Sequence, residues 1–259
     1  MNFPIYQIDA FTSRLFRGNP AAVVVLNEWL ADDVMAAVAA ENNLAETAFV
    51  IMQAEVVPLR WFTPTIEIDL CGHATLAAAR VILNYYRPGQ DTIRFATRSG
   101  ELTVSRQNEL LRMDFPSRPG KPIDVSDALV AALGARPREA LIARDILAVF
   151  DSEDQIRELR PDLDRIAALD AFAVIVSARG KEIDFVSRFF APAAGVPEDP
   201  VTGSAHCTLI PYWSAKLGKQ SLSARQLSAR GGEIWCEMHG DRVVIAGETV
   251  EYLRGEITI

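Results

Sequence analysis

Cysteine and histidine are scarce in this chain, which has three of each among its 259 residues. Three widely spaced cysteines do not form the disulfide framework of a small secreted protein, so we expect a cytoplasmic protein. The chain also lacks the Cys-x-x-Cys and His-Glu-x-x-His patterns, so the sequence predicts no metal site.

An excess of basic residues and long apolar runs are also lacking. The 26 basic residues are outnumbered by 34 acidic ones and form no cluster, which argues against a nucleic acid or an anionic membrane as partner. No apolar run approaches the roughly 20 residues that cross a bilayer, and Met1–Ile5 is not typical of a signal peptide. A Gly-x-Gly-x-x-Gly turn after a strand and a phosphate-binding loop are missing, so we predict no nucleotide and expect no cofactor.

The chain does contain an internal repeat. Three short segments of its first half return in the same order, at similar spacing, in its second half. The pairs are Arg60–Pro64 with Arg188–Pro192, Cys71–Thr75 with Thr202–His206, and Arg98–Leu102 with Arg230–Ile234. This period is too long for a solenoid, whose units run roughly 20–50 residues. It predicts two duplicated domains, and the cleft between two domains is a favoured place for a ligand.

The repeat also sets the expected boundaries. We place an N-terminal domain at residues 1–116 and a C-terminal domain at residues 117–247, with a proline-rich linker near residues 116–122. Residues 248–259 have no counterpart in the first copy, and we expect them to pair back with the first domain.

Each copy combines short strands with one apolar helix. The patterns predict strands at 3–11, 21–26, 48–52, 57–62, 141–150, 172–177, 184–190, 233–238 and 242–246, and a hairpin-like stretch at 92–115. They predict helices at 29–41, 74–84, 126–133, 152–169 with a break at Pro161, and from Gly203 to about residue 216.

Both repeated glycines, Gly72 and Gly203, precede an apolar helix. The first turn of a helix has unpaired N–H groups and a partial positive charge, so it can bind a carboxylate. His73 and Ser204 follow these glycines and can hydrogen-bond a polar substrate. The simpler interpretation is that both glycines only cap helices, but their repetition favours two anion-accepting helix ends that face one cleft.

Two acidic residues are candidates for chemistry or binding. Glu46 lies between a helix and a strand, and burial in a cleft would make its carboxyl a usable general acid and base. Asp199 precedes Gly203 by four residues and either caps the helix or orients the substrate. A glutamate in a loop is more often merely solvated, so its role depends on whether it points into the cleft.

Several motifs together resemble the PhzF (phenazine biosynthesis-like) family of isomerases. They are Asp9–Thr12, Gly18–Val23, Asn43–Thr47, Arg60–Pro64, Gly72–Thr75 and Asp199–His206, and they span nearly the whole chain. The resemblance implies an α+β fold like that of diaminopimelate epimerase, with two pseudo-symmetric domains in which a curled, mostly antiparallel sheet surrounds a central helix. It also implies a homodimer.

The resemblance further implies roles for individual residues. Glu46 would be the catalytic acid/base, and Gly72, His73, Asp199, Gly203 and Ser204 would line the site and hold the substrate. Diaminopimelate epimerase uses a cysteine at each glycine turn; here Cys71 occupies one such place, but Thr202 occupies the other. Because a hydroxyl is too weak an acid to replace a thiol in this reaction, we favour a one-carboxylate mechanism.

The leading hypothesis is therefore a cofactor-independent isomerase that moves a proton within a small carboxylate-bearing substrate, with Glu46 as acid/base in the inter-domain cleft. Two alternatives stay open. One is an amino-acid-type epimerase or racemase that uses Cys71, and the other is a non-catalytic small-molecule binding protein.

Overall fold

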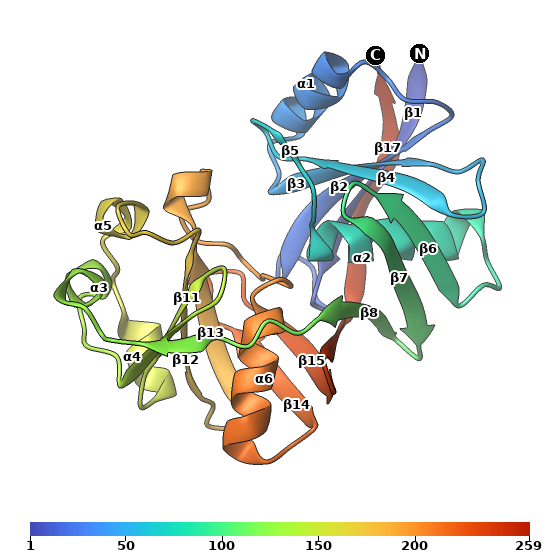
Figure 1. The fold of residues 1–259 in the computed structure, drawn as a ribbon. Coiled ribbons are helices and arrows are strands. Elements are labelled where there is room, and N and C mark those ends of the chain that lie inside the picture. The colour runs from blue at the N-terminus through green and yellow to red at the C-terminus, as the bar shows by residue number, and fades with distance from the viewer. The chain divides into compact units, whose positions relative to one another are not determined.

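The computed structural model describes residues 1–259 and divides into two compact units. Residues 1–114 and 246–259 form the first unit, and residues 115–245 form the second. The helices and strands of both are labelled in Figure 1.

The first unit is a curled sheet with one buried helix. Its strands are β1 (Asn2–Ala10), β2 (Asn19–Leu26), β3 (Glu46–Ile51), β4 (Val57–Phe62), β5 (Glu67–Ile68), β6 (Thr92–Thr97), β7 (Gly100–Gln107), β8 (Leu110–Pro116) and β17 (Thr249–Thr258). Its helices are α1 (Asp32–Asn42) and α2 (Gly72–Val81), and α2 continues as a π-helical segment, Ile82–Tyr86. The tail strand β17 pairs antiparallel with β1.

The two helices of this unit cover opposite faces of β2, which explains why nearly all of its residues are buried. Ala22, Val24 and Leu26 pack with Met35 and Ala39 of α1 in one apolar core. Since side chains alternate along a strand, the intervening residues point toward α2, which contacts β1, β2 and β3. The side chains of α2 are buried on every side except at Gly72 and Arg80, as its apolar sequence predicts.

The second unit repeats this design. Its strands are β9 (Lys121–Ile123), β10 (Glu139–Ile142), β11 (Ile146–Val149), β12 (Val174–Arg179), β13 (Phe185–Phe190), β14 (Ser221–Gln226), β15 (Gly232–His239) and β16 (Arg242–Gly247). Its helices are α3 (Asp127–Leu133), α4 (Glu153–Glu158), α5 (Leu163–Ala167) and the central α6 (His206–Leu217), and Pro192–Ala194 forms a 3₁₀ turn. Helices α3, α4 and α5 pack with β11, β12 and β13 in a separate core.

The order of strand pairing is the same in the two units. In the first, the antiparallel pairs are β17–β1, β1–β2, β3–β4 and β6–β7, and the parallel pairs are β2–β3 and β4–β6. In chain order the directions are antiparallel, antiparallel, parallel, antiparallel, parallel and antiparallel. In the second, β9–β10, β10–β11, β11–β12, β12–β13, β13–β14 and β14–β15 follow the same sequence of directions. The fold class predicted from the sequence, two pseudo-symmetric domains with a central helix in each, is confirmed.

Some local predictions were wrong. Residues 141–150, expected as one strand, form the hairpin β10–β11, because Ala143 donates its N–H to the carbonyl of Asp145 and closes a turn. The helix expected from Gly203 begins only at His206. Helix α1 begins at Asp32, three residues later than its apolar pattern suggests.

Candidate active site

Three elements of the first unit bring polar side chains to one edge of its sheet. Strands β2 and β3 run parallel, with Ala21 opposite Glu46, so Asn19 and Glu46 both lie where these strands begin. Asn43 ends α1 in the left-handed conformation and turns the chain into β3. The first turn of α2 adds His73 at the same edge.

Glu46 and His73 are in contact at this edge. Glu46 Oε2 lies 2.9 Å from His73 Nε2, and the side chains are only 13% and 6% exposed. The two atoms are close but not aligned as a hydrogen bond. Glu46, the first residue of β3, is therefore partly desolvated and lies beside an imidazole.

The other nitrogen of the ring has its own neighbours. His73 Nδ1 lies 3.2 Å from Asn19 Nδ2 and 3.5 Å from Cys71 Sγ. Asn19 is completely buried, and Cys71 is nearly so. The imidazole is thus enclosed between a carboxylate on one side and an amide and a thiol on the other.

The charges of this group depend on burial and on one another. Burial lowers the pKa of His73, but the neighbouring Cys71 and Glu46 more than offset this and raise it well above its ordinary value. Burial raises the pKa of the Cys71 thiol, and the Glu46 carboxylate raises it further. The thiol therefore stays protonated at neutral pH.

The first backbone N–H groups of α2 lie outside the helical hydrogen-bond pattern. Cys71 is the N-cap in an extended conformation and its side chain makes no cap hydrogen bond to the helix. The first intrahelical bond runs from Thr75 N to Cys71 O, so the preceding N–H groups have no helical acceptor. Gly72 does not have a positive φ, so the turn itself does not require glycine.

The corresponding turn of the second unit is tighter. His206, Cys207 and Thr208 donate their N–H groups to the carbonyls three residues earlier, so Gly203 and Ser204 lie in a 3₁₀-like turn before α6. This tight winding delays the α-helix, whose first bond is Leu209 N to Ala205 O.

Equivalent hydrogen bonds stabilise the turns at Gly72 and Gly203. Thr75 Oγ1 donates to the carbonyl of Cys71, the residue before Gly72. His206 Nδ1 donates over 2.8 Å to the carbonyl of Thr202, the residue before Gly203. The repeat in the sequence therefore corresponds to a repeated hydrogen bond across the glycine.

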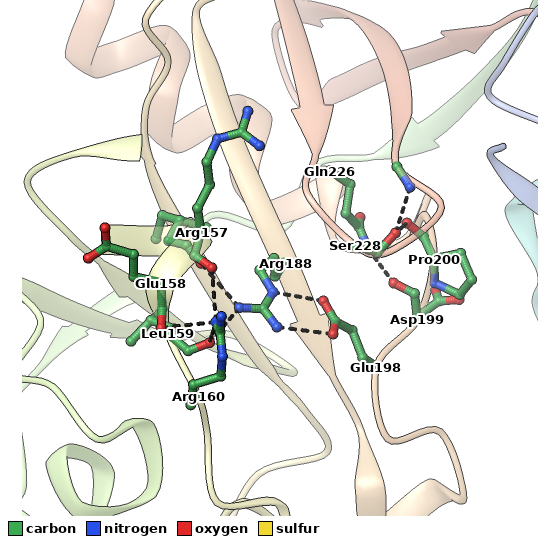
Figure 2. A network of polar contacts seen from close by, with 12 residues as sticks. Arg157, Glu158, Leu159, Arg160, Arg188, Glu198, Asp199, Pro200, Gln226 and Ser228 are labelled. Atoms are coloured by element: carbon green, nitrogen blue, oxygen red, sulfur yellow. Dashed lines mark hydrogen bonds and ion pairs between the residues drawn. The ribbon is translucent and has the colours of Figure 1, made fainter. Parts of the chain in front are cut away.

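Asp199 belongs to a loop that is fixed to its own sheet. Thr202 Oγ1 donates to Asp199 Oδ2, and the fully buried Gln226 donates from Nε2 to the carbonyl of Asp199 while its Oε1 accepts from Thr202 N. Ser228 Oγ donates to the carbonyl of Pro200. Figure 2 shows Gln226 and Ser228 reaching this loop from one side.

The same loop is held from its other side by Arg188. Its Nε and Nη2 donate to the two carboxylate oxygens of Glu198 at 2.7 and 3.0 Å, and its Nη1 donates to the carbonyls that end α4 (Figure 2). Arg60 makes the equivalent two-pronged contact with Glu67, both bonds 2.7 Å long. Each glutamate lies five residues before its glycine, so both glycine turns are approached by an anchored loop.

Comparison with known proteins shows the family of this chain. The sequence profile of the PhzC-PhzF family, described as phenazine biosynthesis-like protein, matches residues 8–255. The chain belongs to this family. It is 50% identical over 260 residues to an uncharacterized isomerase of Pseudomonas aeruginosa, with all of both chains covered.

Solved structures agree with this relationship. A phenazine biosynthesis protein of the PhzF family from Enterococcus faecalis has a TM-score of 0.98 and 45% identity, with both chains fully covered. At 9% identity, a probable proline racemase from Agrobacterium radiobacter still has a TM-score of 0.64, over 99% of this chain and 92% of that one, which shows the shared epimerase-like fold. The predicted enzyme class, a PhzF-like isomerase, is confirmed, and no helix is long and apolar enough to span a membrane.

For this family member, the residues predicted from the sequence divide between the units. Glu46, Gly72 and His73 belong to the first unit, where the structure brings Glu46 and His73 together. Asp199, Gly203 and Ser204 belong to the second. Ser204 Oγ accepts a hydrogen bond from Arg144 Nη2 at 3.3 Å.

Three polar side chains near these turns were not predicted from the sequence. Asn19 entered the sequence analysis only as part of the Gly18–Val23 segment, and its burial beside His73 is visible only in the structure. Arg144 pairs with the buried Asp145 at 2.8 Å, and it lies at the turn of a hairpin where the sequence predicted one continuous strand. Gln226 lies in β14, which was not predicted at all.

Glu46, Cys71 and His73 carry atoms that can bind a metal ion, and these atoms lie within 4.8 Å of one another. However, Glu46 approaches Nε2 while Cys71 approaches Nδ1. A single ion can bind only one nitrogen of a ring, so these three side chains do not converge on one point in this arrangement. The donor set does not fit a metal without turning the ring.

Proposed function

We propose that this isomerase moves a proton within a small carboxylate-bearing substrate, with Glu46 as the acid/base and without a cofactor. Glu46 removes a proton from a carbon of the substrate and returns it to another position on the same face. The contact between Glu46 and His73 is the observation that carries the proposal.

This contact supports the role of Glu46 for a physical reason. A fully solvated glutamate is a weak base and a poor proton donor at neutral pH. Here the carboxylate is mostly shielded from water yet lies beside an imidazole that can hold it in place. A general acid or base that is positioned in this way typically contributes at least about a hundredfold to the rate.

Binding of the substrate is assigned to the glycine turns. The first N–H groups of α2, with Gly72 and His73, would stabilise the negative charge that develops on the substrate during the reaction. We assign Gly203, Ser204 and Asp199 to the same substrate, and the basis for this is the repeat in the sequence.

An epimerase that uses Cys71 is the second candidate, and the 3.5 Å approach of its Sγ to His73 Nδ1 is the observation in its favour. Two features weigh against it. The buried thiol has a raised pKa, and the equivalent position in the second unit is Thr202, which cannot act as a second thiol.

The proposed function is tested with small carboxylates in D₂O, beginning with compounds that co-purify with the protein. A substrate should gain deuterium at carbon with the wild type and lose this exchange with Glu46→Gln. The matched control is Glu41→Gln, an exposed glutamate at the end of α1. If both variants exchange at the wild-type rate, Glu46 is not the acid/base.

The same preparation tests two further expectations. The resemblance to the family implies a homodimer, and light scattering of the purified protein measures it. A compound that binds with the same affinity to wild type and Glu46→Gln, while no carboxylate is turned over, would favour a non-catalytic binding protein.

A further inference from the structure

Asn19 has no role in the proposed chemistry, yet its side chain is completely buried beside His73. It begins β2 directly after Gly18, whose φ of +64° places the chain where an added Cβ would lie 2.1 Å from the carbonyl oxygen of Ala10. Pro20 follows it. The backbone around Asn19 is therefore tightly determined, and its amide is aimed at the ring by the fold.

The two edges of the imidazole have different neighbours. Nε2 faces the carboxyl group of Glu46, which in its ionised form can only accept hydrogen bonds. Nδ1 faces Asn19 Nδ2 at 3.2 Å, and the thiol of Cys71 is farther away, at 3.5 Å. A carboxamide is neutral and offers both a donor and an acceptor from the same plane.

We propose that Asn19 is the positioning residue of His73, holding Nε2–H against Glu46 and offering Nδ1 a partner in both charge states of the ring. In the neutral ring, Nδ1 accepts from the amide N–H of Asn19. In the imidazolium, Nδ1–H donates to the amide oxygen after the amide has turned over. In both states the ring keeps Nε2 beside the Glu46 carboxylate, 2.9 Å away in the structure, and the significance of this for catalysis rests on the proposed function.

Other ionisable groups around α2 have partners of their own. Asp9 on β1 accepts from Phe16 N, Tyr6 pairs with Tyr86, Arg106 on β7 donates to Asn84, and Glu251 on β17 accepts from Tyr85. The remaining charged groups on these elements, Glu101, Arg254 and Glu256, are exposed. Glu46 and Cys71 are thus the ionisable groups that act directly on the ring.

The experiment is a pH titration of the imidazole nitrogens by ¹⁵N NMR, which three histidines make tractable. His73→Gln assigns its signals, and His206 and His239 serve as internal controls. In N19D the added carboxylate can only accept, so His73 should stay cationic to a higher pH, by about one unit or more. In N19A the Nε2 proton should exchange faster with water because the ring is no longer held.

Two outcomes overturn the proposal: a His73 titration unchanged in N19D, or Nε2 proton exchange unchanged in N19A. If neither variant folds, the wild type decides, because the side-chain amide signal of Asn19 must shift as His73 titrates, and an unshifted signal refutes the contact. None of these readouts needs a substrate. Normal exchange of substrate protons in Glu46→Gln would refute the proposed function and leave this result standing.

Discussion

His73 and Glu46 meet at 2.9 Å although they belong to a helix and a strand that are separated in sequence by β4 and β5. The fold makes this contact because β3 begins at the sheet edge where α2 also begins.

The buried His206 should make stability fall in mild acid. Burial lowers its pKa to about 4, while the unfolded chain titrates near 6.5. Between these values the unfolded state binds more protons, so the stabilisation is complete above pH 6.5 and is lost as pH falls toward 4, by up to about 3 kcal/mol. Urea unfolding of wild type and His206→Gln at pH 7.5 and 5 measures it.

The variant should lose less stability than the wild type between the two pH values, because it has no group to protonate at this position. Equal losses in the two proteins would show that His206 is protonated as readily in the folded as in the unfolded state.

Arg188 should contribute more to stability than an exposed arginine in a similar pair. It joins Glu198 to the end of α4 and is 11% exposed, so Arg188→Gln leaves the Glu198 carboxylate without its two-pronged donor and should cost about 3 kcal/mol. Arg165→Gln is the matched control, because its pair with Asp162 is exposed and should be worth at most about 1 kcal/mol. Chemical denaturation would contradict this account if both changes had the same small effect.

Cys71 should be dispensable for proton transfer. Its thiol is buried and its pKa is raised, so it does not supply a thiolate at neutral pH. Cys71→Ser is expected to keep substrate deuteration within about tenfold of wild type, the scale of a packing change rather than the loss of a general base. Loss of exchange in Cys71→Ser, with exchange kept in Glu46→Gln, would instead establish the epimerase alternative.

Much of the fold could be predicted from the sequence because its signals are local. The apolar pattern of α2 marks a helix buried on all sides, and Ser126 and Ser152 cap α3 and α4 as expected for serines before helices. The repeated segments then indicated two similar domains, and the equal order of strand pairing shows that they share a topology.

Features that depend on distant residues could not be predicted. The late start of α6 follows from a turn in which His206 and the remote Gln226 bind Thr202. The hairpin of β10 and β11 contains no glycine or proline at its turn, and its Asp145 is buried and paired with Arg144. For the site, the sequence indicated Glu46 and His73 separately, but only the fold shows their contact.

The most direct test of the central claim is the turnover rate of Glu46→Gln on the first substrate identified, measured beside Glu41→Gln. The amide keeps the shape of the side chain but cannot take up a proton from carbon. The account predicts a fall in kcat of at least about a hundredfold with a much smaller change in substrate affinity, and wild-type kcat in the control. A kcat for Glu46→Gln equal to that of the wild type would contradict it.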